Sequence, residues 1–178
     1  MKNIWIYLRY DLPLHFILLW TNWLPDNVIF LRFRGCLVKP FFAACGKNLR
    51  LGRNVLFNNP ANIKIGNNVY FAYGCWVSAR GEITFSDDVT IGPYCAITSS
   101  NHKRIGDSYS NEEAIIEPIE VGNGCWLGAH CVVTAGTKIG DGSVLGAGAV
   151  VVKNIPGNVL ATGVPARPIR KLGGDEIE

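Results

Sequence analysis

The C-terminal third of the chain carries a six-residue repeat. Aliphatic residues recur at every sixth position, at Val121, Leu127, Val133, Ile139, Leu145 and Val151. A small residue follows four positions after each of the first five, at Cys125, Cys131, Thr137, Ser143 and Ala149. A period of six matches neither the turn of an α-helix nor the two-residue alternation of a simple strand. It matches a short strand followed by a tight corner, three of which close a triangular coil of about eighteen residues.

The same pattern extends through the middle of the chain. Its large inward positions are Leu51, Phe57, Ile65, Phe71, Val77, Phe85, Ile91 and Ile97, and the modest residues four positions later are Val55, Val69, Cys75, Val89 and Cys95. Two steps, 57 to 65 and 77 to 85, are eight residues long and predict wider corners. Equivalent residues of successive coils stack about 4.8 Å apart, and glycine supplies the corner conformations. The sequence therefore predicts an all-β fold, a parallel β-helix of hexapeptide repeats.

Composition agrees with a folded chain. Of 178 residues, 20 are glycine and 48% are hydrophobic, which is too hydrophobic for a disordered protein. We expect three parts: an N-terminal segment (1–47) that is helical, the β-helix (48–160) with a protruding loop (98–118), and a basic tail (161–178) that closes the solenoid. The loop is expected to lack regular structure and to carry function, because insertions of this length are usually functional or mobile. Residues 173–178 are expected to fray.

The six cysteines do not indicate disulfides or zinc. Cys75, Cys95, Cys125 and Cys131 occupy the small position of the repeat, where a free thiol packs as a small hydrophobic group. None of the six has the short spacing typical of a structural zinc site. Cys36 and Cys45 lie outside the repeat, and the sequence assigns them no role. With no secretory signal in the sequence, we expect a cytoplasmic protein with reduced thiols.

The N-terminal segment is both apolar and basic. Residues 1–50 hold seven Lys or Arg and two Asp, a net +5, whereas the remainder carries −2 and lacks the concentrated basic face of a nucleic-acid binder. Arg9, Asp11, Pro13 and His15 interrupt the apolar residues, so the segment is too short to span a bilayer. Residues 4–42 suit a helix in a membrane interface, where Trp and basic residues meet the headgroups. They equally suit a helical cap on the first coil or an extension across an oligomer.

Three stretches of this sequence resemble the hexapeptide-repeat acetyltransferases. They are SSNHKR at 99–104, the hexapeptide run VGNGCWLGAH…VVVKNIP at 121–156, and GVPARPIRKL at 163–172. The nearest branch is that of the sugar and polysaccharide O-acetyltransferases, with the galactoside, maltose and xenobiotic enzymes. The resemblance covers about residues 48–171. It implies a left-handed β-helix, a homotrimer with active sites between neighbouring subunits, and acetyl-CoA as the donor.

The resemblance makes His102 the expected catalytic base. A sugar hydroxyl is a poor nucleophile, and an imidazole, whose ordinary pKa is near 6.5, can take its proton. Asn101 is expected to orient His102 or to touch the acceptor. The γ-class carbonic anhydrases share a similar solenoid but need three histidine ligands. Here the third histidine besides His102 and His130 is His15, in the N-terminal segment, so we expect no metal.

The resemblance also implies a coenzyme site. Trp126 and Ala129 match positions that line the pantetheine tunnel, with the Ala129 N–H steadying the thioester carbonyl as negative charge develops. We expect Trp126 at a corner, covered either by the coenzyme or by a neighbouring subunit. Ala147 leaves room for the pantetheine arm. Lys153, Arg167 and Arg170 are expected to meet the coenzyme phosphates, since cations suit phosphate oxygens, unless they form a solvated basic tail.

The expected function is therefore transfer of an acetyl group from acetyl-CoA to a carbohydrate hydroxyl. A surface polysaccharide or a lipid-linked saccharide precursor is the expected acceptor, and the N-terminal segment would then contact the inner face of the membrane. The sequence leaves two alternatives open. One is acetylation of another small acceptor, such as serine, a nucleotide-linked amino sugar or an antibiotic. The other is a non-catalytic solenoid scaffold.

Overall fold

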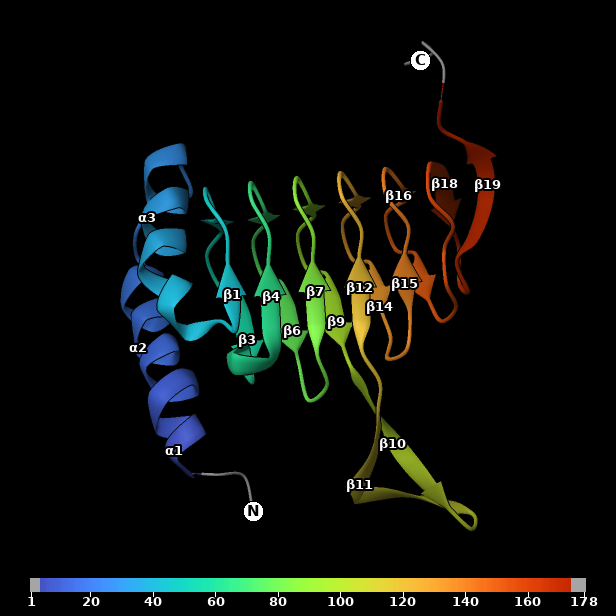
Figure 1. Ribbon diagram of the computed structural model, residues 1–178, viewed down its shortest axis with the longest axis horizontal. Coiled ribbons are helices and arrows are strands. Elements are labelled where there is room, and N and C mark those ends of the chain that lie inside the picture. The colour runs from blue at the N-terminus through green and yellow to red at the C-terminus, as the bar shows by residue number, and fades with distance from the viewer. Residues whose placement is uncertain (1–3, 174–178) are drawn as a thin grey trace.

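A computed structural model describes residues 4–173, so the outermost ends of the predicted N-terminal segment and of the predicted tail lie outside the described residues. The chain forms a three-sided solenoid, with helices at one end and a hairpin projecting from one side (Figure 1). Each side is a sheet whose neighbouring strands come from successive coils. The predicted parallel β-helix is confirmed.

The strands of successive coils form three sheets, called A, B and C here. Sheet A contains β1 (Ala44–Cys45), β4 (Ile63–Ile65), β7 (Ile83–Phe85), β12 (Ile119–Val121) and β15 (Lys138–Ile139). Sheet B contains β2 (Arg50–Leu51), β5 (Tyr70–Phe71), β8 (Thr90–Ile91), β13 (Trp126–Leu127), β16 (Val144–Leu145), β18 (Val159–Thr162) and β19 (Arg167–Lys171). Sheet C contains β3 (Leu56–Asn58), β6 (Trp76–Ser78), β9 (Ala96–Thr98), β14 (Val132–Val133) and β17 (Val150–Val151). The chain runs from A to B to C and back to A.

The repeat positions form the core of the solenoid. Every large position predicted to point inward is buried, and Phe57, at 7% exposed, is the most accessible of them. The small positions are buried as well, including the four repeat cysteines. In the N-terminal coils, Phe57, Phe71 and Phe85 stack edge to face inside the prism, with ring centroids 5.3 and 5.0 Å apart. This geometry is favourable for aromatic pairs in a core.

The corner that leads from sheet C to sheet A is the variable one. In the first two coils it is the wider corner predicted from the eight-residue steps, and the first of these contains the short 3₁₀ helix η3 (Pro60–Asn62). In the next coil it holds the insertion 98–118. The expectation that this insertion lacks regular structure is wrong, because it folds into an antiparallel hairpin of β10 (Ser100–Ile105) and β11 (Ser108–Ile116). Gly106, with a positive φ of 58°, makes the tight turn possible.

Helices cover the N-terminal end of the solenoid. They are α1 (Ile4–Ile6), the π-helical turn η1 (Tyr7–Asp11), α2 (Leu12–Thr21), α3 (Val28–Val38) and the 3₁₀ turn η2 (Lys39–Phe41). Leu14, Leu18 and Val38 join the core cluster of the first coil, so the segment packs as a cap. Sheet A already begins at β1, within the stretch predicted as N-terminal extension. None of the described helices is long and apolar enough to cross a membrane.

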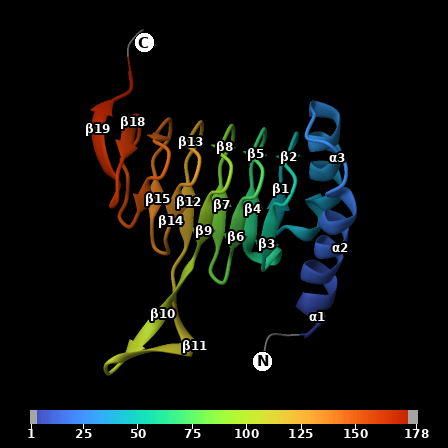
Figure 2. The same cartoon turned by 180° about the vertical axis from the view of Figure 1, so that it is seen from behind.

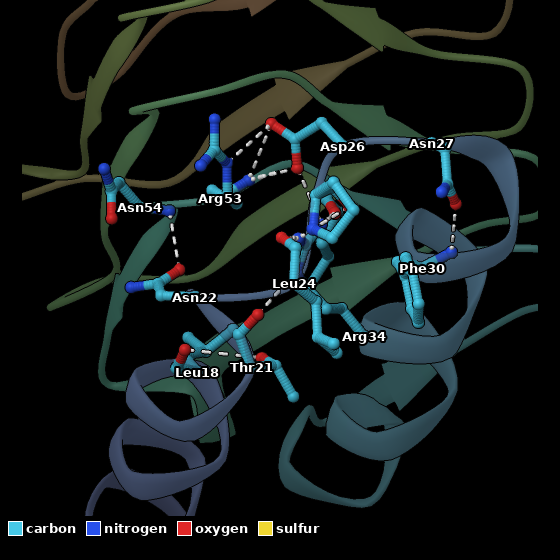
Figure 3. Close-up of polar contacts among 12 residues, drawn as sticks. Leu18, Thr21, Asn22, Leu24, Asp26, Asn27, Phe30, Arg34, Arg53 and Asn54 are labelled. Carbon is cyan, nitrogen blue, oxygen red and sulfur yellow. Dashed lines mark hydrogen bonds and ion pairs between the residues drawn. The ribbon is translucent and has the colours of Figure 1, made fainter.

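A buried arginine joins the helical cap to the solenoid. Arg34 of α3 has no exposed surface and donates a hydrogen bond to the Leu51 carbonyl of β2 at 2.9 Å. It also donates to the Asp26 carboxylate at 2.8 Å (Figure 3). Its guanidinium donates further to the carbonyl of Thr21, the last residue of α2, and to that of Leu24 in the connection between the two helices. Asp26 in turn accepts from the backbone N–H of Arg53 at 3.1 Å. One charged network therefore fixes both helices on the first coil.

The C-terminal tail closes the other end. After β18, the chain turns back and adds β19 to sheet B in the antiparallel direction, with Leu160 opposite Arg170 and Thr162 opposite Arg167. The last coil is thus covered by a strand of the same chain.

Candidate functional site

His102 lies in the middle of β10, on the projecting hairpin. Its Nδ1 is 2.8 Å from the backbone carbonyl oxygen of Ser110 on β11. A carbonyl oxygen can only accept a hydrogen bond, so this contact assigns a proton to Nδ1 and leaves the lone pair of the neutral ring on Nε2. The hairpin therefore holds the imidazole in the tautomer that can accept a proton at Nε2.

His102 lines a cavity of about 370 Å³ between the hairpin and sheet C. The cavity is lined by the predicted pair Asn101 and His102 together with residues of β6, β9, β10, β11 and the wider corner: Trp76, Ser78, Arg80, Thr98, Ser100 and Ala114. Sequence reasoning placed Asn101 and His102 together but did not find the other lining residues. The available signal was the eight-residue step from 77 to 85, because the wider corner that it predicts contributes Arg80.

Hydrogen bonds hold the wider corner at 79–82, which contributes Arg80 to this cavity. Ser99, which is fully buried, accepts a hydrogen bond from the Gly81 N–H at 2.9 Å, and its own hydroxyl lies 3.0 Å from the Gly81 carbonyl. The Asn62 side chain donates to the carbonyl of Ala79 at 3.0 Å. The corner that contributes Arg80 to the cavity is therefore held by side chains of the neighbouring coils.

The predicted pantetheine residues lie on another part of the solenoid. Trp126 is in β13 on the outer face of sheet B, between Thr90 and Val144 of the adjacent coils, and is 54% exposed. The expectation that it lies at a corner is wrong, because the corner follows Leu127. Trp126 occupies the outward position next to the buried Leu127, as the alternation of a strand requires.

Ala129 and Ala147 lie one above the other at the corner between sheets B and C. The Ala129 carbonyl accepts a hydrogen bond from the Gly148 N–H at 2.8 Å. A Cβ on Gly128 would approach the Ala147 nitrogen to 2.7 Å, so glycine is needed for the two corners to stack. The Ala129 N–H donates to no other described residue. This corner thus presents an unused backbone donor beside a surface of very small side chains.

The three predicted phosphate-binding residues are exposed near the C-terminal end. Arg167 and Arg170 belong to β19 at the edge of sheet B. The Arg167 guanidinium donates to the adjacent Ala166 carbonyl at 2.8 Å. Lys153 follows β17 and therefore lies at the corner between sheets C and A. The structure thus brings the two arginines together on one strand and leaves Lys153 at a different corner.

Within one chain, the histidine and the pantetheine residues do not meet. His102 projects from the corner between C and A, whereas Trp126 is on sheet B and Ala129 at its junction with C. In Figure 1 and from behind in Figure 2, the hairpin projects from one side of the solenoid and sheet B lies at the opposite side. One chain alone therefore does not bring the predicted base and the predicted pantetheine residues together.

The described residues offer no grouping for a metal. Within residues 4–173, no three His, Cys, Asp or Glu side chains come together in a cluster that could hold an ion. His15 is on α2, where its ring contacts Phe16 edge to face. His130 is stacked on Tyr94 with a centroid distance of 5.1 Å.

Comparison with known proteins gives a consistent result. The family model described as bacterial transferase hexapeptide (six repeats) matches residues 118–153. The galactoside O-acetyltransferase of Escherichia coli K12 is 38% identical over 139 residues, which is 78% of this chain and 68% of that protein. A relative from Schizosaccharomyces pombe is 35% identical over 116 residues, and the chain spans 56% of its length.

Solved structures agree with the sequence comparison. A galactoside acetyltransferase in complex with coenzyme A superposes with a TM-score of 0.81 at 35% identity, covering 91% of this chain and 80% of that one. A maltose O-acetyltransferase from Clostridium difficile 630 also gives 0.81, at 26% identity, covering 95% and 89%. The chain therefore belongs to the hexapeptide-repeat acetyltransferase family.

Proposed function

We propose that this protein transfers the acetyl group of acetyl-CoA to a hydroxyl of a carbohydrate, with His102 as the general base. The observation that carries the proposal is the bond from Nδ1 of His102 to the Ser110 carbonyl, which leaves Nε2 ready to accept a proton at a cavity. Relatives named as galactoside and maltose O-acetyltransferases, and a relative solved with coenzyme A, support the reaction class.

The proposed reaction uses the groups described above. Nε2 of His102 takes the proton of the acceptor hydroxyl as the oxygen attacks the thioester carbonyl. The N–H of Ala129, from a neighbouring subunit, donates to the oxygen that becomes negative. When the carbon–sulfur bond breaks, the proton on His102 passes to the departing thiolate. The products are an acetyl ester and coenzyme A, and His102 returns to its starting tautomer.

Removing the imidazole tests this proposal. His102→Ala should lower acetyl transfer by about 10²- to 10⁴-fold, the range that a general base contributes. Free-thiol release with a panel of saccharides measures the rate, and thermal shift with coenzyme A measures binding, which should persist. The matched control is His15→Ala, which removes an exposed histidine far from the cavity. Near-normal turnover by His102→Ala would overturn the assignment.

We propose that the active unit is a homotrimer. From β4 to β15 the outward positions of sheet A are polar or charged: Lys64, Thr84, Glu120 and Lys138. Lys138 forms an ion pair with Glu120, and Lys64 forms one with Glu82, which precedes β7. Sheet C instead presents a continuous apolar row, Leu56, Trp76, Ala96, Val132 and Val150. Sheet B adds Trp126 and Val144. A closed ring in which these two sides contact neighbours would bury apolar surface and leave sheet A in water.

We further propose that the helical cap docks on an anionic membrane surface at the cytoplasmic side, where it would meet a lipid-linked or polysaccharide precursor. Trp20, Trp23 and Ile29 are 61%, 71% and 74% exposed. Charge supports a lipid partner, because the cap's acidic residues Asp11 and Asp26 both bond to the solenoid's first coils. Arg9 and Arg32 are exposed on the same cap, and exposed apolar and basic residues together are typical of interfacial helices.

Vesicle sedimentation of the full-length protein tests the docking surface. The double variant Trp20→Ser with Trp23→Ser should lose most binding to vesicles of phosphatidylglycerol, and the wild type should bind phosphatidylcholine weakly. Val164→Ser, which removes an equally exposed apolar side chain at the opposite end of the molecule, is the control. Truncation is unsuitable, because Leu14 and Val38 belong to the core. Equal sedimentation of the double variant and the wild type would reject a lipid partner.

A further inference from the structure

Arg80 lies between two neighbouring cavities. The first is the cavity of about 370 Å³ that contains His102, and the second, of about 320 Å³, extends toward η1 and α1. Arg80 is the residue that lines both. The second cavity is bounded by apolar and aromatic side chains of the helical cap and of β11, including Ile6, Tyr7 and Ile116. The two cavities therefore adjoin at Arg80, the first on the side of His102 and the second on the side of the helical cap.

The guanidinium of Arg80 has no acidic partner among the described residues. Ion pairs occupy Arg34, Arg53 and Arg104, and they also occupy three lysines, but none includes Arg80. The one acid that lines the second cavity is Asp11, whose carboxylate accepts from the Asn59 N–H at 2.9 Å. The first cavity has no acid in its lining. An uncompensated positive charge therefore stands at the junction of the two cavities.

The backbone that carries this charge is held in place. The Asn62 side chain donates to the carbonyls of Ala79 and Arg80 at 3.0 and 3.3 Å. Gly81, the next residue, is bonded to buried Ser99 through both its N–H and its carbonyl. Arg80 thus extends from a corner that neighbouring coils fix on both sides, while its guanidinium remains available. The base of the side chain is therefore fixed, and the exposed guanidinium at its end can donate to an anion.

We propose that Arg80 selects an anionic saccharide as the acceptor: a carboxylate or phosphate of the acceptor binds the guanidinium while a sugar hydroxyl reaches His102. The inference rests on the proposed acetyl transfer and adds the chemical class of its acceptor. The planar guanidinium can donate two parallel hydrogen bonds to either anion. A uronic acid would supply a carboxylate, and a glycosyl phosphate would supply a phosphate with its further substituent directed along the second cavity.

Three acceptors that carry no charge, a carboxylate or a phosphate distinguish the two kinds of anion. Free-thiol release is measured with methyl glucoside, methyl glucuronide and glucose 1-phosphate, using the full-length protein. We expect kcat/KM for one anionic acceptor to exceed that of methyl glucoside by at least tenfold. Arg80→Gln should remove this preference by raising KM for the anion at least tenfold more than KM for methyl glucoside, and Arg80→Lys should restore part of it. Arg104→Gln, which removes a cation at the hairpin tip, is the control and should retain the preference.

Direct binding provides a second measurement that needs no turnover. Isothermal titration of the two anionic sugars should give affinity for the wild type and for Arg104→Gln, with at least a tenfold loss in Arg80→Gln. Loss with the uronide alone assigns a carboxylate, and loss with the phosphate alone assigns a phosphate. Equal affinity in Arg80→Gln, or no binding of either anion to the wild type, overturns the inference. If the neutral sugar is acetylated in a His102-dependent way without any effect of Arg80, the proposed function stands and only the anionic acceptor fails.

Discussion

At the scale of single residues, the small inward positions of the repeat show most clearly how the corners of the solenoid pack. The thiols of Cys75, Cys95 and Cys125 each donate to the carbonyl of a glycine at a stacked corner, at 3.1 to 3.2 Å. Burial raises the pKa of the Cys125 thiol. Since the thiolate is the nucleophile, such a group reacts only when the corner opens. Cys36, by contrast, is exposed on α3.

The rate at which each cysteine is alkylated should therefore fall as the burial of its thiol increases. With iodoacetamide at pH 8, we expect rapid modification of Cys36 and slow modification of Cys45, whose half-buried thiol has its pKa raised to about 11 by burial. The four repeat cysteines should react only in denaturant, where all six become accessible. Peptide mass spectrometry over time measures each site. Fast native modification of Cys125 would contradict a closed corner and would show local opening of the solenoid.

Single residues also show what could be predicted from the sequence and what could not. The inward burial of the repeat cysteines follows from spacing alone, because position in the hexapeptide decides which way a side chain points. The tautomer of His102 does not, since its partner is a carbonyl eight residues away that only the hairpin brings to 2.8 Å. Arg80 was missed for a related reason. Its importance depends on two cavities formed by segments far apart in the chain.

At the scale of elements, the helical cap depends on Arg34. A buried guanidinium is costly to desolvate, and here that cost is offset by an ion pair with Asp26 and by carbonyl acceptors at the end of α2 and on β2 (Figure 3). Removing the guanidinium would leave those acceptors without their donor. The helices would then be attached to the first coil chiefly by apolar contacts such as those of Leu14 and Val38.

Arg34→Ala should accordingly lower the free energy of unfolding by about 3 kcal/mol, the magnitude found when one partner of a buried ion pair is removed. Urea denaturation followed by circular dichroism measures the change. Arg32→Ala, on the exposed side of the same helix, should change it by less than about 0.5 kcal/mol. Similar losses in the two variants would mean that the network contributes little to the attachment of the cap.

The hairpin shows how an element can be misread. Its length suggested an irregular loop, yet Gly106 and Asp107 separate two polar strands as a two-residue turn. That Gly-containing dipeptide was the available signal. Both strands are largely exposed, so they lack the alternation of apolar residues by which strands are usually found. The wider corners before it in sequence lie at the same junction of the prism, which explains why the solenoid tolerates an insertion there.

On the scale of the whole molecule, the three outer faces are unequal although the inner repeat is regular. The hexapeptide pattern predicts the prism because it records only inward positions. Outward positions follow no fixed pattern in the sequence. The apolar row that contains Ala96, Val132 and Val150 on sheet C is recognised only when the strands are stacked in register. His102 and Trp126 also lie on different sides of the solenoid, which the pattern of inward positions does not predict. The solenoid of one chain carries both halves of the proposed site but does not join them.

The trimer proposal makes a prediction that combines assembly with activity. Sedimentation equilibrium of the wild type should give three times the chain mass of 19.5 kDa. Val132→Lys places a charge in the apolar row of sheet C and should yield monomers, because an unpaired charge is costly to bury in an interface. Thr84→Lys adds the same side chain at an outward position of polar sheet A and should remain trimeric.

Activity should fall together with assembly. If the Ala129 N–H and the His102 imidazole act from different subunits, monomeric Val132→Lys should lose acetyl transfer even though its own His102 and hairpin are intact. Thr84→Lys should keep it. Circular dichroism of both variants checks that the solenoid remains folded, so that loss of activity reports on the missing neighbour. A monomeric wild type, or a folded monomer of Val132→Lys with full activity, would refute the shared site and would require one chain to bring the two sides together by another route.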